Sequence, residues 1–136
     1  MKNKGARIDT YSTQYDIDFV VANSKVTLEE LRELYYYADE EELDDTWDNG
    51  AATTGVVKRK SDNTVVVLVR YMGRSQYKSS GDKLLDIVNV ASHEATHVAI
   101  DIYNSVCATI DVENQETFAY FVGYITERIL KTLLNK

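Results

Sequence analysis

Both histidines of the 136-residue chain lie in one short motif, His93-Glu94-Ala95-Thr96-His97. Residues four positions apart share one face of an α-helix, so both imidazoles can bind a single zinc ion. Glu94 lies about 100° around the helix from His93, so its carboxylate can reach a water molecule on the metal and act as general base. The motif therefore predicts a zinc centre. The alternative interpretation is a pair of ordinary helix histidines beside the core.

A third protein ligand is expected, because a catalytic zinc ion commonly has three ligands and one open position, with two histidines and a glutamate as a known set. Glu116 is the candidate. It shares a helix face with the small residues Ala119 and Gly123, and close packing of that face on the motif helix would bring its carboxylate to the histidines. Glu113 and Asp111 are the competing carboxylates. In the alternative interpretation Glu116 binds no metal and only stabilises the N-terminus of a helix, where acidic residues are common.

Tyr120 follows Glu116 by one helical turn and is the candidate for a catalytic tyrosine. Its hydroxyl could hydrogen-bond a metal ligand or polarise a substrate carbonyl. Because the chain has ten tyrosines, plain packing is the alternative role. Asp101, one turn after His97, is expected to be a solvated residue.

The surrounding sequence predicts an α+β domain that holds this motif on a helix. Alternating or continuous apolar runs predict strands over residues 16–22, 54–60 and 64–71. Apolar residues at helical spacing predict helices over residues 28–42, 83–104 and 114–134. The order is β-α-β-β-α-α, with one small sheet of about three strands packed on the helices. Residues 1–14 are polar and lack periodicity, so we expect a loose arm before a single domain over 15–136.

Local signals refine this arrangement. Thr27, with Glu30 three residues later, forms a capping-box pattern at the start of the first helix. Residues 61–63 are turn chemistry, so the second and third strands are predicted to pair as an antiparallel hairpin. The strand over 64–71 is apolar on both faces, which indicates cover on both sides. Its edge, if free, could hold an extended peptide by β-augmentation, and the loop over 72–81 could form one rim of the cleft.

Charge and composition exclude several classes of function. The chain has 22 acidic and 15 basic residues and a net charge of -7, which disfavours a nucleic-acid binder with a general basic face. No apolar run approaches the roughly 20 residues that cross a bilayer, and no apolar segment follows the basic start as in a secretory signal peptide. The single cysteine excludes an intramolecular disulfide framework. We therefore expect a cytoplasmic protein that binds neither nucleic acid nor membrane.

The motif His93-Glu94-Ala95-Thr96-His97, followed by ENQETFAYFVGY over 113–124, resembles the small zincin-like metallopeptidase domains encoded by phages and prophages. It is also similar to the minimal gluzincin pattern, in which a glutamate on the helix after the motif is the third zinc ligand. The resemblance covers roughly residues 64–130. It implies that His93, His97 and Glu116 bind zinc and that Glu94 is the catalytic base. Larger gluzincins carry an aspartate one turn after the third ligand to orient a histidine, whereas this chain has Tyr120.

The resemblance implies a zinc-dependent peptidase that hydrolyses peptide bonds through metal-activated water, with a peptide or protein substrate in the host cytoplasm. The alternative is a zincin-fold phage protein with a weak or inactive site, which serves as a binding component or is associated with the particle. A third interpretation, a nucleic-acid accessory protein, is disfavoured by the net charge. It rests only on the basic residues Lys2, Lys4, Arg7, Lys58, Arg59 and Lys60.

Overall fold

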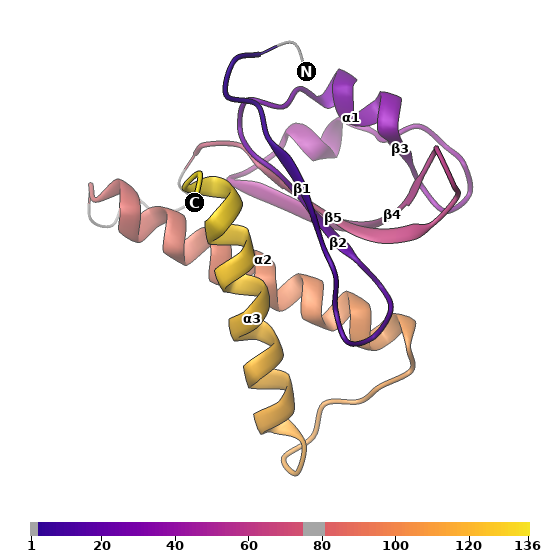
Figure 1. Ribbon diagram of the computed structural model, residues 1–136, viewed down its shortest axis with the longest axis vertical. Helices are drawn as coiled ribbons and strands as arrows, with labels where there is room; N and C mark the ends of the chain where they lie inside the picture. The colour runs from indigo at the N-terminus through magenta and orange to yellow at the C-terminus, as the bar shows by residue number, and fades with distance from the viewer. Residues whose placement is uncertain (1–2, 75–80) are drawn as a thin grey trace.

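The computed structural model describes residues 3–74 and 81–136, which form an α+β fold around one five-stranded sheet (Figure 1). The strands are β1 (Ile8–Tyr11), β2 (Phe19–Ala22), β3 (Tyr35–Tyr36), β4 (Ala52–Arg59) and β5 (Val65–Tyr71). The helices are α1 (Leu28–Leu34), the 3-10 helix η1 (Asp45–Asp48), α2 (Lys83–Ser105) and α3 (Gln115–Leu133). The sheet order is β1-β2-β5-β4-β3. The α+β class is as predicted, with five strands in place of about three.

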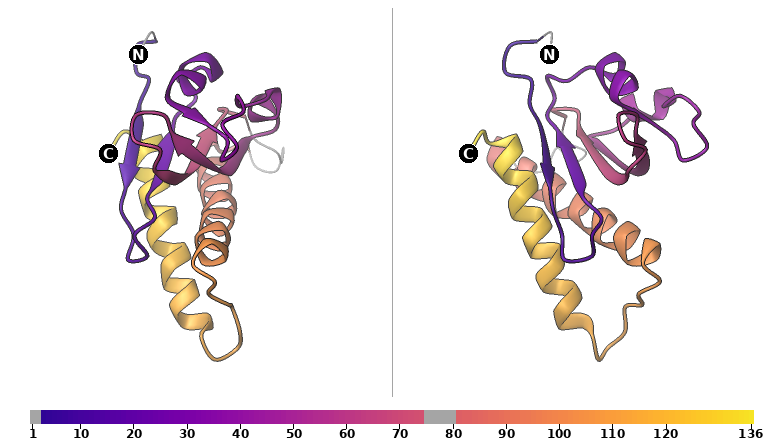
Figure 2. Two further views of the ribbon diagram at one scale, coloured as in Figure 1. Left: turned by 90° about the vertical axis from the view of Figure 1, so that its right-hand side faces the viewer. Right: turned by 45° about the vertical axis from the view of Figure 1, so that its right-hand side comes forward.

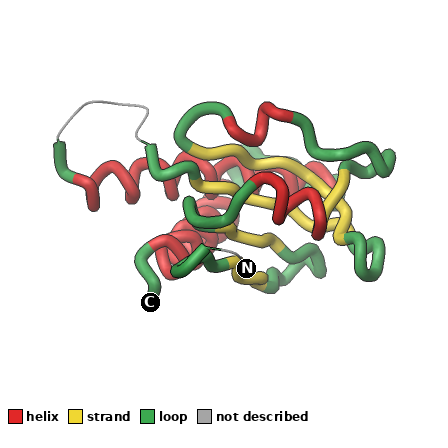
Figure 3. Tube along the Cα trace, turned by 90° about the horizontal axis from the view of Figure 1, so that it is seen from above, coloured by secondary structure: helices red, strands yellow, loops and turns green. Residues whose placement is uncertain are grey.

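The two central strands, β2 and β5, are parallel to each other, and the other neighbouring strands are antiparallel. β2 and the middle of β5 (66–70) are buried on both faces because helices cover each side of the sheet, as Figures 2 and 3 show. α2 and α3 lie on one face, and α1 with η1 lies on the other. This two-sided cover was predicted for β5 from its continuous apolar run.

The core on the α2 side explains how the motif helix is oriented. Ala91, Ala95 and Ala99 lie at successive four-residue steps along α2 and are completely buried against the sheet and α3. Their small side chains allow the helix to pack closely. The motif histidines lie on a different face of α2, which leaves them exposed.

The first helix begins as predicted and ends early. The Thr27 hydroxyl accepts a hydrogen bond from the Glu30 amide at 3.1 Å, which caps the helix. The helix ends at Leu34, whereas the sequence predicted residues 28–42. The next two residues become β3, because aromatic side chains favour strands and the carboxylates that follow would oppose the dipole at a helix C-terminus.

The N-terminal segment is not the loose arm that the sequence predicted for residues 1–14. Ile8–Tyr11 forms β1, which pairs antiparallel with β2. The Tyr11 ring packs on Phe19 with 5.4 Å between the ring centroids. β1 carries few apolar residues and is mostly half-buried, so its pattern gave no signal for a strand.

The predicted hairpin is present, because β4 and β5 pair antiparallel along their length. β5 also pairs with β2, so neither edge of β5 is free for a peptide, which corrects the prediction for the strand over 64–71. The loop predicted as a cleft rim over 72–81 lies largely outside the described residues. No helix in the described parts of the chain is long and apolar enough to span a bilayer.

Candidate metal centre

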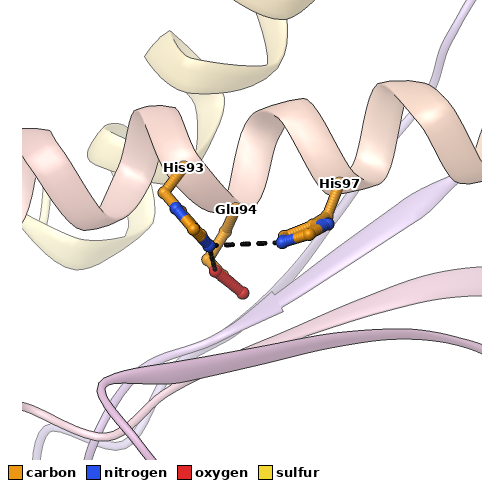
Figure 4. Close-up of side chains that lie close together, drawn as sticks. All are labelled: His93, Glu94 and His97. Carbon is orange, nitrogen blue, oxygen red and sulfur yellow. Dashed lines mark hydrogen bonds and ion pairs between the residues drawn. The ribbon is translucent and has the colours of Figure 1, made fainter. Parts of the chain in front are cut away.

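The two histidines of the motif approach each other on the exposed surface of α2. Their side chains project from the helix toward the strands (Figure 4), and the Nε2 atoms of His93 and His97 lie 3.2 Å apart. A zinc ion bound tetrahedrally to two imidazoles at about 2.0–2.1 Å would hold these nitrogen atoms about 3.3–3.4 Å apart. The spacing of the pair therefore fits one shared zinc ion.

Glu94 lies beneath the histidine pair, and its side chain is only 7% exposed. Its Oε1 atom accepts a hydrogen bond of 3.1 Å from the Thr54 hydroxyl on β4. Its Oε2 atom lies 3.9 Å from His93 Nε2 (Figure 4). One carboxylate oxygen is thus occupied by the sheet, and the other faces the position between the imidazoles.

Thr54 is the site residue that sequence reasoning missed. It is separated from Glu94 by 40 positions and comes from a different layer of the fold. Strand alternation gives a partial signal, because the buried Val57 places Thr54 on the opposite face of β4, the face toward α2. Which residue of α2 would meet Thr54 depends on how the helix crosses the sheet.

Comparisons with protein-family models, with curated proteins and with solved structures find no match. The function therefore has to follow from the chemistry of the site itself. Among the described residues, the ligand atoms of His93, Glu94 and His97 lie within 4.8 Å of one another, as a metal site requires. Groups of this kind also occur without a metal ion.

The structure does not bring Glu116 to the histidines, contrary to the prediction. Glu116 is exposed in the first turn of α3, and Figures 1 and 2 show that this end of α3 extends away from the middle of α2. Ala119 and Gly123 are exposed as well, and a Cβ atom added at Gly123 would meet nothing within 4 Å. The face of α3 that packs inward carries Phe121 and Ile125 instead.

Tyr120 is 74% exposed on the same outer face of α3. It lines a surface hollow between α3 and the turn that joins β1 to β2, together with Thr13 and Tyr124. This exposed position on the outer face of α3 gives no support for a catalytic role of Tyr120.

Of the two competing carboxylates, Asp111 has a local role and Glu113 is exposed just before α3. The Asp111 carboxylate accepts hydrogen bonds from the backbone amides of Glu113 and Asn114, both at 2.9 Å, and so shapes the turn before α3. Asp101 is half-buried, not fully solvated as expected. Burial raises the pKa of the Asp101 carboxyl, and the nearby His97 acts in the opposite direction.

Proposed function

We propose that this protein is a zinc-dependent peptidase with a zincin-like fold, in which His93 and His97 hold the metal and Glu94 is the general base. The observation that carries this proposal is the 3.2 Å approach of the two Nε2 atoms above a buried carboxylate. The resemblance of the motif and its downstream segment to phage-encoded zincin-like domains supports the same chemistry.

Zinc, when bound, supplies a Lewis acid that polarises a carbonyl and lowers the pKa of water. The protein's own contribution lies in the two carboxylate oxygens of Glu94. Oε1 is held by Thr54, which leaves Oε2 to accept a proton beside the imidazoles and to pass it to the leaving amine. Only the carboxylate is buried, whereas the His93 side chain beside it is 53% exposed, so water can reach the metal position.

The free edge of β4 offers a place for the peptide backbone. β3 pairs with β4 only at Arg59 and Lys58, so in the described chain no strand covers the outer edge from Ala52 to Val57. The Arg59 amide bonds to the β5 side and the Lys60 amide to the β3 side. By alternation the amides and carbonyls of Thr54 and Val56 point to the open edge. An extended peptide can add there beside the metal centre.

The missing third protein ligand favours a second candidate function. In the described residues only Glu94 joins the two histidines, and a two-histidine site leaves more positions to water than a usual catalytic zinc site. The second candidate is a zincin-fold binding or particle-associated protein with weak or no hydrolytic activity.

A metal count and a cleavage assay separate the two. The protein purified without added metal should carry about one zinc ion per chain, and His93→Ala or His97→Ala should remove it. Zinc should raise the melting temperature of the wild type, because a ligand that binds only the folded state stabilises it. Absence of both effects contradicts the metal centre.

Cleavage is then measured on a broad peptide library, with and without a chelator. Glu94→Gln should keep the fold and the zinc ion and abolish hydrolysis, because the amide cannot accept the proton. Zinc binding without cleavage of any peptide by the wild type would favour the binding or particle-associated alternative.

A further inference from the structure

The face of β4 that carries Thr54 continues past Val56 to two lysines, Lys58 and Lys60. Val57 is buried in the core beneath α1, so its neighbours Val56 and Lys58 point to the opposite face, the one toward α2. The register of β3 on β4 pairs Tyr36 with Lys58 and places both side chains on this same face. The line from Thr54 through Val56 to Lys58 therefore leads directly away from the metal centre.

This end of the sheet is not covered by α2. Val56 and Val65 are 37% and 42% exposed, although they lie on the same face as the fully buried Val67. Figure 1 shows that α2 lies farther from the sheet toward the end of the sheet that carries the β4–β5 turn. We call this uncovered surface the ledge; its residues are Tyr36, Val56, Lys58, Lys60 and Val65.

Two ammonium groups are fixed on the ledge by one aromatic ring. The Nζ atoms of Lys58 and Lys60 lie 5.8 Å and 5.6 Å from the Tyr36 ring centroid, within the range of cation–π attraction. The Tyr36 hydroxyl is in turn anchored to Asn63 Oδ1 at 2.7 Å. One carboxylate lies beside this group: Glu40 Oε1 is 3.8 Å from Lys58 Nζ and accepts from the Tyr36 hydroxyl at 3.3 Å. The Glu40 side chain is 61% exposed and the Lys58 side chain 20% exposed, so a substrate carboxylate would compete with Glu40 for Lys58 and meet the exposed Lys60 directly.

A peptide on the free edge of β4 would be directed over the ledge. β3 occupies that edge from Lys58 onward, so a peptide that pairs with Thr54 and Val56 has to leave the plane of the sheet there. The other face of the sheet at this point is filled by the core under α1, including Tyr35 and Val57. The open side is the ledge.

We propose that the ledge binds an acidic side chain of the peptide substrate, three or four residues from the bond that is cleaved. This inference rests on the proposed peptidase function. Lys58 lies four residue steps along the strand from Thr54, about 13 Å at roughly 3.3 Å per step, and an extended peptide covers that span in about four residues. A substrate carboxylate would meet two ammonium groups, although the net charge of the chain is -7.

The test compares matched peptides that differ only by Glu or Gln at each of the third and fourth positions on either side of the cleaved bond. At one such position, the Glu peptide should show a KM about fivefold lower than the Gln peptide, with kcat little changed and the advantage reduced by salt. The double variant Lys58→Gln/Lys60→Gln should abolish the difference in KM between the Glu and Gln peptides.

Charge reversal gives a second, independent readout. Lys58→Glu should shift the preference from a Glu peptide to a Lys peptide, whereas Lys131→Gln, an exposed lysine on α3, should leave the preference unchanged. Equal KM values for Glu and Gln peptides at all four positions would contradict the proposal that the ledge binds an acidic side chain. The proposed peptidase function would not be affected by that result. Zinc-loaded protein that cleaves no peptide would overturn the proposed function, and the ledge with it.

Discussion

Glu94 is a buried carboxylate whose two oxygens have different neighbours. Oε1 accepts the Thr54 hydroxyl, and Oε2 faces the imidazole of His93. A long acidic side chain loses rotamer freedom when it is buried, and the bond to a strand fixes one orientation of the carboxylate. Thr54 is therefore a positioning residue for the base proposed here.

Thr54→Val should reduce kcat about 10- to 100-fold with an unchanged zinc content, because the valine keeps the shape of the side chain and removes the donor. A hydrogen bond to a charged group contributes about 1.5–3 kcal/mol, and a loss of 1.4 kcal/mol corresponds to about tenfold in rate. Steady-state kinetics on a zinc-loaded variant measure this effect.

The neighbouring Thr53 provides the matched control. Among the described residues its hydroxyl bonds to the backbone carbonyls of Thr46 and Asn49 alone, at 3.4 Å and 3.5 Å, so Thr53→Val should leave kcat near the wild-type value. A wild-type kcat in Thr54→Val would show that the orientation of Glu94 does not depend on this bond.

Glu116→Gln should leave the zinc affinity within about twofold of the wild type, because the structure places Glu116 on the outer face of α3. Competition with a chromophoric chelator measures the affinity, and His97→Ala is the positive control. A loss of tenfold or more would restore Glu116 as the third ligand, since loss of a protein ligand leaves an incomplete zinc shell.

The sequence predicted the site where the signal is local and failed where it is not. His93 and His97 lie four residues apart on one helix, so their closeness could be predicted without knowing how the helix packs. The bond from Thr54 to Glu94 joins residues 40 positions apart. It depends on the angle between a helix and a sheet, which no spacing in the sequence records.

At the scale of elements, α3 illustrates how a correct helix can be given the wrong partner face. The apolar spacing that predicted a helix over 114–134 does mark its packed face, because Phe121, Ile125 and Ile129 are buried against the sheet and α2. The small-residue face was assigned to the motif helix because small residues permit close packing. In the structure α2 itself supplies the small residues, and Gly123 faces outward.

Gly123→Ala should stabilise the protein by about 0.5–1 kcal/mol, because glycine in a helix interior is less favourable than alanine by that amount. The space is available, since an added Cβ atom would meet nothing within 4 Å. Urea unfolding followed by circular dichroism measures the change. Destabilisation together with weaker zinc binding would indicate that this face packs on α2 after all.

Gly55→Ala is the contrasting variant. A Cβ atom at Gly55 would lie 3.1 Å and 3.2 Å from ring carbons of the buried Trp47, so the substitution should destabilise the protein by about 1–3 kcal/mol. The change in the free energy of unfolding should therefore have opposite signs at Gly123 and Gly55, because Gly123 faces solvent and Gly55 faces Trp47.

For the whole molecule, the two ends of the described chain are held together. Figure 2 shows β1 running beside α3, and the Arg7 guanidinium donates to the backbone oxygen of Lys136 at 3.4 Å. The segment predicted to be loose thus closes one edge of the sheet against the last helix. Sparse apolar content hides such a strand in the sequence, because its stability comes from pairing with β2 and from polar contacts with α3.

The centre of these polar contacts is Thr132, which is completely buried near the end of α3. Its hydroxyl donates to Asp9 Oδ2 at 2.7 Å and accepts from the Tyr11 hydroxyl at 2.7 Å. Arg7 Nε also donates to Asp9 Oδ2, at 2.5 Å. One hydroxyl therefore connects β1 to α3, two elements that lie near opposite ends of the sequence.

Thr132→Val should lower the free energy of unfolding by about 1–3 kcal/mol, because the Asp9 carboxylate and the Tyr11 hydroxyl each lose a partner in half-buried surroundings. Thr126→Val is the matched control on the same helix, since the Thr126 hydroxyl donates to the Val122 carbonyl one turn earlier. Urea unfolding of both variants measures the difference. If residues 1–14 were a loose arm, the two substitutions would cost the same, whereas a docked β1 requires the larger loss at Thr132.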